Sequence, residues 1–256
     1  QGARTKYLKE PAVGAPNFKS KKKARKSYTT NNQLTKNKAT GKVKPTIQLG
    51  KDHIHLPKVG DIKINKHRSP GNGWKIKSAT VKQTKSGKYF ISVLFEFTKE
   101  ISSVAVTKER SLGLDYSSHD FYVDSNGDAA NYPRFYRKSE EKLAKEQRKL
   151  SRMKYGSKNY EEQKHKVQLL HEKIANQRKN FCHVLSTAIA KQYDAVYVED
   201  LNLRNLARTL KLGKSTNDNG FGMFRVMLQY KLEALGKIFA KIDKWYPSSK
   251  TCHVCG

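Results

Sequence analysis

The sequence predicts an α+β chain, in which an antiparallel, barrel-like β domain precedes an α/β domain with a helical hairpin. Three observations support this prediction. Residues 1–106 contain short strand-like runs separated by Gly and Pro. Residues 107–246 alternate strand and helix patterns, and two of the helix patterns are long and strongly charged. Residues 247–256 form a separate short segment that contains a C-x-x-C pair.

The strands of the first domain follow from β-branched and aromatic residues between turn signals. Ser86-Gly87 supplies the turn of a long hairpin between the last two strands. We expect strands at 46–49, 54–56, 61–64, 76–83 and 89–97.

The second domain opens with a predicted strand hairpin, 111–116 paired with 121–124. Ser139 is a candidate N-cap for a helix that ends near Tyr155, and Ser157 for a longer helix that ends near Gln192. Apolar residues recur three, four or seven positions apart, which predicts an antiparallel helical hairpin. The pattern continues with a strand at 194–200, a helix at 223–240 and a strand at 241–246.

Charge is the strongest compositional signal. Lys and Arg number 52 against 22 Asp and Glu, a formal charge of +30. This balance excludes most enzymes of small neutral substrates and predicts a polyanionic partner. The chain has no membrane-spanning apolar run and no signal-peptide pattern, so we expect no membrane partner and a cytoplasmic, nucleoid-associated location in a prokaryotic-type cell. Three cysteines are too few for a disulfide framework.

The basic residues concentrate towards the N-terminus, where 1–100 hold 24 Lys or Arg and 5 Asp or Glu. A charge run is often only a solvated or disordered face. Aromatic and amide residues interleave with this one, which favours a phosphate-contacting surface. The candidate nucleic-acid-binding residues of the run are Lys21, Lys22, Lys23, Arg25 and Lys26.

Two acids stand at the ends of short apolar strands. Asp115 follows Leu112-Gly113-Leu114, and Glu199 follows Val196-Tyr197-Val198. Carboxylates at neighbouring strand ends can converge, and their hard oxygens suit Mg²⁺ or Mn²⁺. Acids also commonly close strands and cap helices, and two-metal sites generally need three or four carboxylates. Spacing alone therefore leaves both interpretations open.

Cys252 and Cys255 form the C-x-x-C pair, which could be half of a Zn²⁺ site or a redox pair. The preceding Pro-Ser-Ser and the following Gly favour zinc, provided that a second C-x-x-C lies beyond Gly256. Cys182 lies beside Phe181 in the long helix pattern and is expected to be a small core residue.

Five segments in order resemble the TnpB proteins, which are transposon-encoded RNA-guided nucleases related to compact type V CRISPR effectors. The segments are GLDYSSHDFYVDSNG, RKSEEKLAKEQRKLSRMKYGSKNY, HEKIANQRKNFCHVLST, VYVEDLNLRNL and KWYPSSKTCHVCG. Upstream, GAPNFKSKKKARKSYTTNN and HIHLPKVGDIKI are similar to the wedge β-barrel of that family. The resemblance implies a wedge domain, then an RNase H-like RuvC domain, then the start of a zinc ribbon.

The resemblance also implies roles for particular residues. Asp115 matches the family's first catalytic acid and Glu199 its second, each a ligand of catalytic Mg²⁺. Cys252 and Cys255 match the first half of its Zn²⁺ site. A third acid and a second cysteine pair are expected beyond Gly256.

As partners, the resemblance implies a guide RNA and double-stranded target DNA, read by base pairing next to a short motif. The segment Tyr28, Thr29, Thr30, Asn31 and Asn32 is the candidate for approaching that motif, the alternative being a polar loop that contacts only phosphates. Four basic residues near the helical turn are candidates for lining the guide–target channel: Arg148, Arg152, Lys154 and Lys158.

Other functions remain open at this point. A nuclease-dead relative would act as a repressor, binding the same RNA and DNA without cutting. Such a relative would have no reason to keep both acids. A compact type V CRISPR effector differs only in its genetic neighbourhood. The interpretation as a DNA-joining transposase has weaker support, since the order of the motifs matches TnpB.

Overall fold

The computed structural model describes residues 7–8, 10, 14–15, 26–36, 41–202, 218 and 220–242. The chain divides into two compact units, Gln1–Thr98 and Lys99–Gly256, and each is described by itself. The boundary between functional domains at 106/107 stays a prediction.

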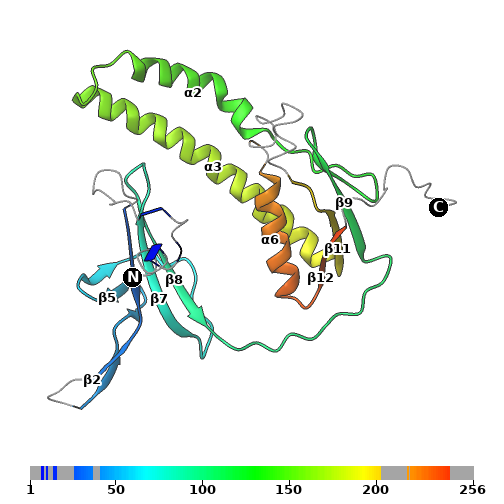
Figure 1. The fold of residues 1–256 in the computed structure, drawn as a ribbon, viewed down its shortest axis with the longest axis horizontal. Helices are drawn as coiled ribbons and strands as arrows, with labels where there is room; N and C mark the ends of the chain where they lie inside the picture. Colours follow the sequence, from blue (N-terminus) through cyan, green and yellow to red (C-terminus); the bar gives the residue numbers. More distant parts are fainter. Residues whose placement is uncertain are drawn as a thin grey trace. The chain divides into compact units, whose positions relative to one another are not determined.

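The described residues of the first unit form three small antiparallel sheets (Figure 1). The largest joins β1 (Ser27–Asn31), β7 (Lys75–Gln83) and β8 (Tyr89–Glu96). A second joins β4 (Gln48–Leu49), β5 (His53–Leu56) and β6 (Gly60–Lys63). The third is the ribbon of β2 (Leu34–Lys36) and β3 (Val43–Pro45).

The core of this unit forms where the inner faces of the first two sheets meet. Strand residues alternate between faces, so β5 buries Ile54 and Leu56, and β7 buries Ala79. Ile47 completes this fully buried set. The described strands of the unit form separate sheets and do not close into the predicted barrel. Strands β4, β5 and β6 have only two to four residues each, and they pair with one another and not with β8.

The second unit is built on a four-stranded mixed sheet in the order β10-β9-β11-β12. The central strands β9 (Ser111–Ser117) and β11 (Ala195–Glu199) are parallel. At the edges, β10 (Phe121–Asp124) is antiparallel to β9, and β12 (Ile238–Ile242) is parallel to β11. The chain is thus of mixed α and β class, as predicted.

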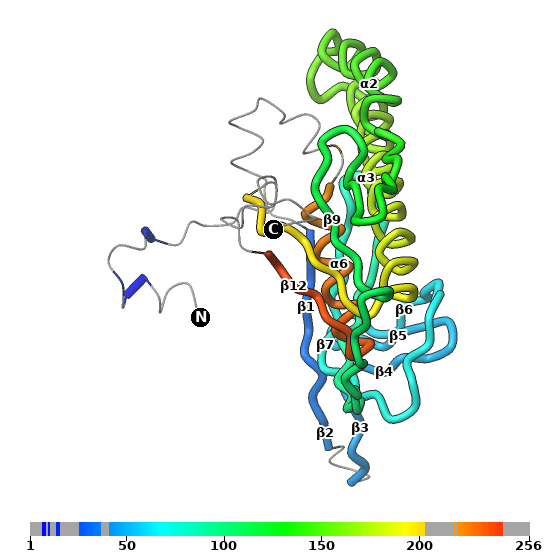
Figure 2. The backbone as a smooth tube through the Cα atoms, turned by 90° about the vertical axis from the view of Figure 1, so that its right-hand side faces the viewer, coloured from blue at the N-terminus to red at the C-terminus, as the bar shows by residue number. Residues whose placement is uncertain are grey.

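Two long helices, α2 (Phe135–Ser151) and α3 (Lys158–Gln192), form the predicted antiparallel hairpin and lie side by side in Figures 1 and 2. Ser157 caps α3, where its Oγ accepts a hydrogen bond from the Tyr160 amide at 3.2 Å. This cap is confirmed. The predicted cap at Ser139 is wrong, because the N-cap of α2 is Arg134, five residues earlier, which adopts a left-handed φ of 51°.

The last helix, α6 (Phe221–Glu233), is shorter than the predicted helix at 223–240. Gly236 has a φ of +71°, and a Cβ there would collide with the carbonyl oxygen of Ser102. Only Gly allows this turn. The chain then enters β12 three residues earlier than predicted.

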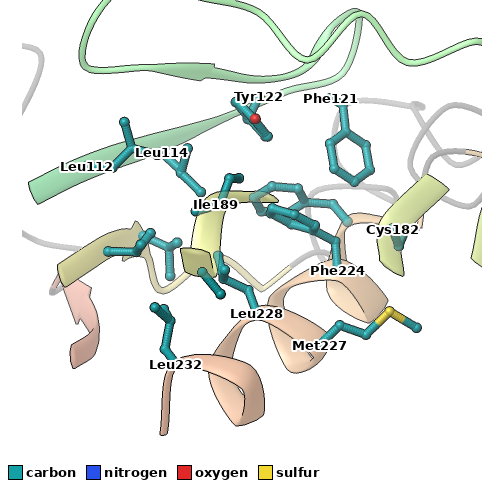
Figure 3. Packing of buried hydrophobic residues seen from close by; sticks show 14 of the residues in the cluster. Leu112, Leu114, Phe121, Tyr122, Cys182, Ile189, Phe224, Met227, Leu228 and Leu232 are labelled. Carbon is teal, nitrogen blue, oxygen red and sulfur yellow. The ribbon is translucent and has the colours of Figure 1, made fainter. Parts of the chain in front are cut away.

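The core of the second unit lies between the sheet and the helices α3 and α6 (Figure 3). Leu112 and Leu114 from β9 meet Phe224 and Leu228 from α6. Phe121 is completely buried and packs edge-on against Phe224, with ring centroids 5.2 Å apart. This core fixes the position of the central strands, whose ends carry the predicted acids.

Candidate functional site

The strand register brings the two predicted acids to the same end of neighbouring strands. Leu114 of β9 pairs with Val198 of β11 in the parallel ladder. Asp115 directly follows Leu114, and Glu199 directly follows Val198. Both strands bury their preceding apolar residues, whereas Asp115 is exposed and Glu199 half-buried. Because side chains alternate along a strand, both carboxylates lie on the sheet face opposite the core.

The end of β11 is held in place by a basic residue from α6. The Arg225 guanidinium donates hydrogen bonds to the carbonyl oxygens of Glu199, at 3.2 Å, and Leu201, at 3.4 Å. It also lies over the Phe221 ring, 5.9 Å from the centroid. Arg225 cannot be predicted from the sequence, because nothing in its spacing relates it to Glu199.

Two other acids near this strand end serve the fold. The Asp124 carboxylate accepts hydrogen bonds from the amides of Asn126, at 2.9 Å, and Asp128, at 3.0 Å, and so closes the turn after β10. The Asp200 carboxylate lies 3.2 Å from the Lys241 ammonium. In the described part of the chain, the Asp115 carboxylate has no such hydrogen bond or ion pair.

The chemistry of the acid pair suits a hard divalent cation. Carboxylate oxygens are the ligands that Mg²⁺ and Mn²⁺ prefer, and a cation relieves the repulsion between like charges at adjacent strand ends. Across the residues that the structure describes, no group of three or more His, Cys, Asp or Glu gathers. Asp115 and Glu199 therefore stand as a pair, without a third such group beside them among the described residues.

The predicted zinc ligands Cys252 and Cys255 lie outside the described residues. Cys182 is a core residue: it is fully buried in α3, and burial raises the pKa of its thiol to about 11. A thiol with this pKa stays protonated at neutral pH and is a poor metal ligand.

The predicted basic surface is described only in part, since Lys21, Lys22, Lys23 and Arg25 lie outside the described residues. Lys26 is exposed directly before β1.

Within the candidate segment, alternation along β1 separates two kinds of residue. Tyr28 and Thr30 are half-buried, whereas Thr29 and Asn31 are exposed. The Tyr28 hydroxyl donates to the carbonyl oxygen of Pro57 at 2.8 Å.

Asn32, at the end of the segment, is tied into the first unit by its own amide. Its Nδ2 donates to the carbonyl oxygen of Ile76 at 3.0 Å, and its Oδ1 accepts from the Ile47 amide at 2.9 Å. Thr29 and Asn31 are thus the members of the segment with exposed polar groups.

The structure gathers the other basic candidates at one place, the turn between α2 and α3. All four are exposed, and they lie within eleven residues of sequence: Arg148, Arg152, Lys154 and Lys158. Tyr155, 82% exposed, lies among them. An exposed cluster of cations with an aromatic ring is the pattern of a nucleic-acid backbone contact.

At its other end, α3 is anchored to the sheet through Asp194. This carboxylate is almost fully buried and pairs with Arg110 and, at 2.9 Å, with Lys237. The hydrogen bonds from Arg110 and Lys237 lower the pKa of Asp194 from 3.8 to about 2. Lys237 also donates to the carbonyl oxygens of Ala190, at 2.9 Å, and Tyr193, at 3.0 Å, at the carboxyl end of α3.

The described helices include none with the length and apolar character needed to cross a membrane.

Comparison with known proteins gives these features a family context. Residues 92–210 match the OrfB_IS605 family, "Probable transposase", and residues 221–256 match the Cas12f1-like TNB domain. The "Putative RNA-guided DNA endonuclease" of Streptomyces pristinaespiralis is 31% identical over 244 residues, which cover 94% of this chain and 56% of that protein. The protein InsQ of Escherichia coli (strain K12), with the same description, is 30% identical over 218 residues, 79% of this chain and 53% of that protein.

The chain thus spans about half the length of these curated relatives. Among solved structures, the cryo-EM structure of the Cas12f1–sgRNA–target DNA complex matches with a TM-score of 0.54. The match covers 99% of this chain and 61% of that one at 14% identity, which shows likeness of fold. The resemblance to the TnpB family that the five segments predict is confirmed.

Proposed function

We propose that this chain carries the guide-binding and nuclease parts of a transposon's RNA-guided DNA endonuclease. The observation that carries the proposal is the register of β9 and β11, which brings Asp115 and Glu199 to one end of adjacent parallel strands. These are the two positions that match the family's first and second catalytic acids. The descriptions of the relatives from Streptomyces and Escherichia coli support the same activity.

In this proposal, Asp115 and Glu199 hold the catalytic Mg²⁺, or Mn²⁺. When bound, such ions stabilise the attacking and leaving oxygens of the phosphodiester that is hydrolysed. Arg225 acts as a positioning residue, since it fixes the backbone that carries Glu199. The third acid that the family uses would complete the set.

The finer architecture is part of the same proposal. The first unit corresponds to the wedge domain, and residues 107–246 to the RuvC-like domain. The mixed sheet supports this, since Asp115 follows Gly-Leu on its first strand and Glu199 ends the strand after the helical hairpin. Cys252 and Cys255 would supply half of a Zn²⁺ site.

The nucleic-acid contacts follow from charge and exposure. We assign Thr29 and Asn31, whose polar groups are exposed on β1, to the approach of the short motif on target DNA. The four cations at the α2–α3 turn, Arg148, Arg152, Lys154 and Lys158, would contact the backbone of the guide–target duplex.

The first experiment is to purify the protein expressed from its complete native gene and to sequence the nucleic acid that copurifies with it. We expect one structured RNA with a variable tail. DNA matching that tail is then incubated with the complex in Mg²⁺, and in EDTA as the control. Cleavage only in Mg²⁺ supports the nuclease, and stable binding without cleavage supports a repressor. Random or absent RNA contradicts guided recognition altogether.

A further inference from the structure

The first unit contains a cavity that the proposed catalytic chemistry does not use. It has a volume of about 360 Å³ and lies between the two three-stranded sheets and the segment 64–70 that joins β6 to β7. Its size is within the range of about 300–1,000 Å³ that is typical of ligand sites. Every lining residue lies between 49 and 95, so the cavity belongs to this unit alone.

The inner wall of the cavity is apolar and aromatic. Leu49, Ile91 and Val93 form one part of it, and Trp74 and Phe95 another. The Trp74 ring stacks on Phe97, with centroids 4.0 Å apart and planes 3° from parallel. Phe97 is not among the lining residues. Phe97 therefore supports Trp74 from outside the cavity and holds it as a fixed aromatic wall.

The edge of the cavity is basic and polar. The segment 64–70 contributes Asn65, Lys66, His67, Arg68 and Ser69. The Lys66 ammonium donates to the carbonyl oxygen of Gly50 at 3.0 Å. His67 and Arg68 are exposed, and neither side chain has a hydrogen bond or ion pair in the described part of the chain.

We propose that this cavity binds one unstacked nucleobase of an RNA, with Trp74 as the stacking surface and Arg68 as the contact to the adjacent phosphate. An apolar aromatic wall beside an exposed guanidinium matches the two halves of a nucleotide, a planar base and an anionic phosphate. Asn65 and Ser69 offer hydrogen-bonding groups for the base edge. This inference rests on the proposed function, in which the chain holds a structured RNA.

RNA fits this cavity better than duplex DNA for an energetic reason. Structured RNA contains bulges and loops whose bases are already unstacked and can enter a pocket. In duplex DNA the same base must first be unpaired and unstacked, which disfavours its entry. The first unit is also strongly basic, so the backbone on either side of the base would meet a favourable potential.

The test uses the full chain and a single-stranded oligoribonucleotide with one 2-aminopurine, whose fluorescence is quenched when the base stacks on an aromatic ring. We expect the wild-type protein to quench this base on binding. Trp74→Ala should abolish the quenching and weaken binding by about tenfold, since stacking on one aromatic ring is worth about that factor. Phe90→Ala is the matched control, because Phe90 is 56% exposed on the same unit and does not line the cavity.

A second variant covers the case in which Trp74→Ala fails to fold, as judged by circular dichroism. Arg68→Gln removes an exposed charge without touching the core, and it should reduce the slope of log K against log salt by about one. Unchanged quenching in folded Trp74→Ala contradicts the proposal that this cavity binds a nucleobase. An unchanged slope of log K against log salt in Arg68→Gln contradicts it as well. If both variants behave like the wild-type protein while the guide RNA still copurifies, the nucleobase site is wrong and the proposed function stands.

Discussion

At the scale of single residues, four aspartates of the second unit have four different environments. Asp124 closes a turn, Asp200 pairs with Lys241, and Asp194 is buried between Arg110 and Lys237. Asp115 is exposed and has no such partner within the described residues. A carboxylate that makes no such bond within the described part of the protein is available for a cation.

This difference predicts the effect of neutralising each acid. Asp115→Asn keeps the shape of the side chain but removes the charge that a divalent cation needs, so DNA cleavage should fall by at least about a thousandfold with RNA and DNA binding retained. Asp200→Asn, one residue beyond Glu199, should retain cleavage. The measurement is the single-turnover cleavage rate in Mg²⁺. A fully active Asp115→Asn protein would show that this residue binds no catalytic metal.

Asp194 predicts a specific pH dependence of stability. Its pKa is lowered from 3.8 to about 2 by Arg110 and Lys237. A lowered carboxyl pKa stabilises the fold at pH values above the unfolded pKa, and this contribution disappears as the pH falls through the folded pKa.

The difference in unfolding free energy between wild type and Asp194→Asn should therefore be constant above about pH 5 and shrink between about pH 4 and pH 2. Urea unfolding of both proteins across this range measures it. A difference that stays constant to about pH 2 would contradict the ion-pair assignment.

At the scale of the elements, residue patterns predicted the helical hairpin and both acid-bearing strands. Long periodic patterns and short apolar strands are the strongest local signals. The end of α6 was misplaced because the helix ends at a left-handed turn at Gly236, and only the structure shows the close approach there of Ser102, which is distant in sequence. Strand β1 was missed for a similar reason, since its polar residues form a strand only by pairing with β7.

The α2–α3 turn predicts how salt affects binding of nucleic acid. Changing its four cations, Arg148, Arg152, Lys154 and Lys158, to Gln should reduce the slope of log K against log salt by about one for each phosphate that the turn no longer binds. The control is Lys149→Gln with Lys164→Gln, because these ammonium groups are already paired with Glu146 and Glu161. Binding to a guide–target duplex across a salt series measures both slopes. Equal slopes would place the phosphate-binding surface elsewhere.

At the scale of the whole molecule, the described residues form two separate hydrophobic cores, one in each unit. The charge pattern and the motifs differ between the two parts of the sequence, and the domain boundary at 106/107 that they predict stays a prediction. They do not predict that the described strands of the first unit stay in separate sheets. Closing a barrel depends on the exact length and register of short strands.

Separate cores predict separate responses to a core substitution. Phe224 is completely buried in the second unit, and Phe224→Ala should cost about 3–5 kcal/mol through the cavity it leaves. Hydrogen exchange followed by mass spectrometry should then show faster exchange in β9 and β11, with β7 and β8 unchanged. Faster exchange in all four strands would mean that the units unfold as one.

The length of α3 has a mechanical consequence. Its 35 residues span roughly 52 Å, with the ion pairs of Asp194 at one end and the basic turn at the other. A tilt of about one degree at the anchored end displaces the far end by roughly 0.9 Å, which exceeds the range of roughly 0.5 Å that hydrogen-bond distances span. The ion pairs of Asp194 at the anchored end of α3 thus bear on where the cations of the α2–α3 turn lie.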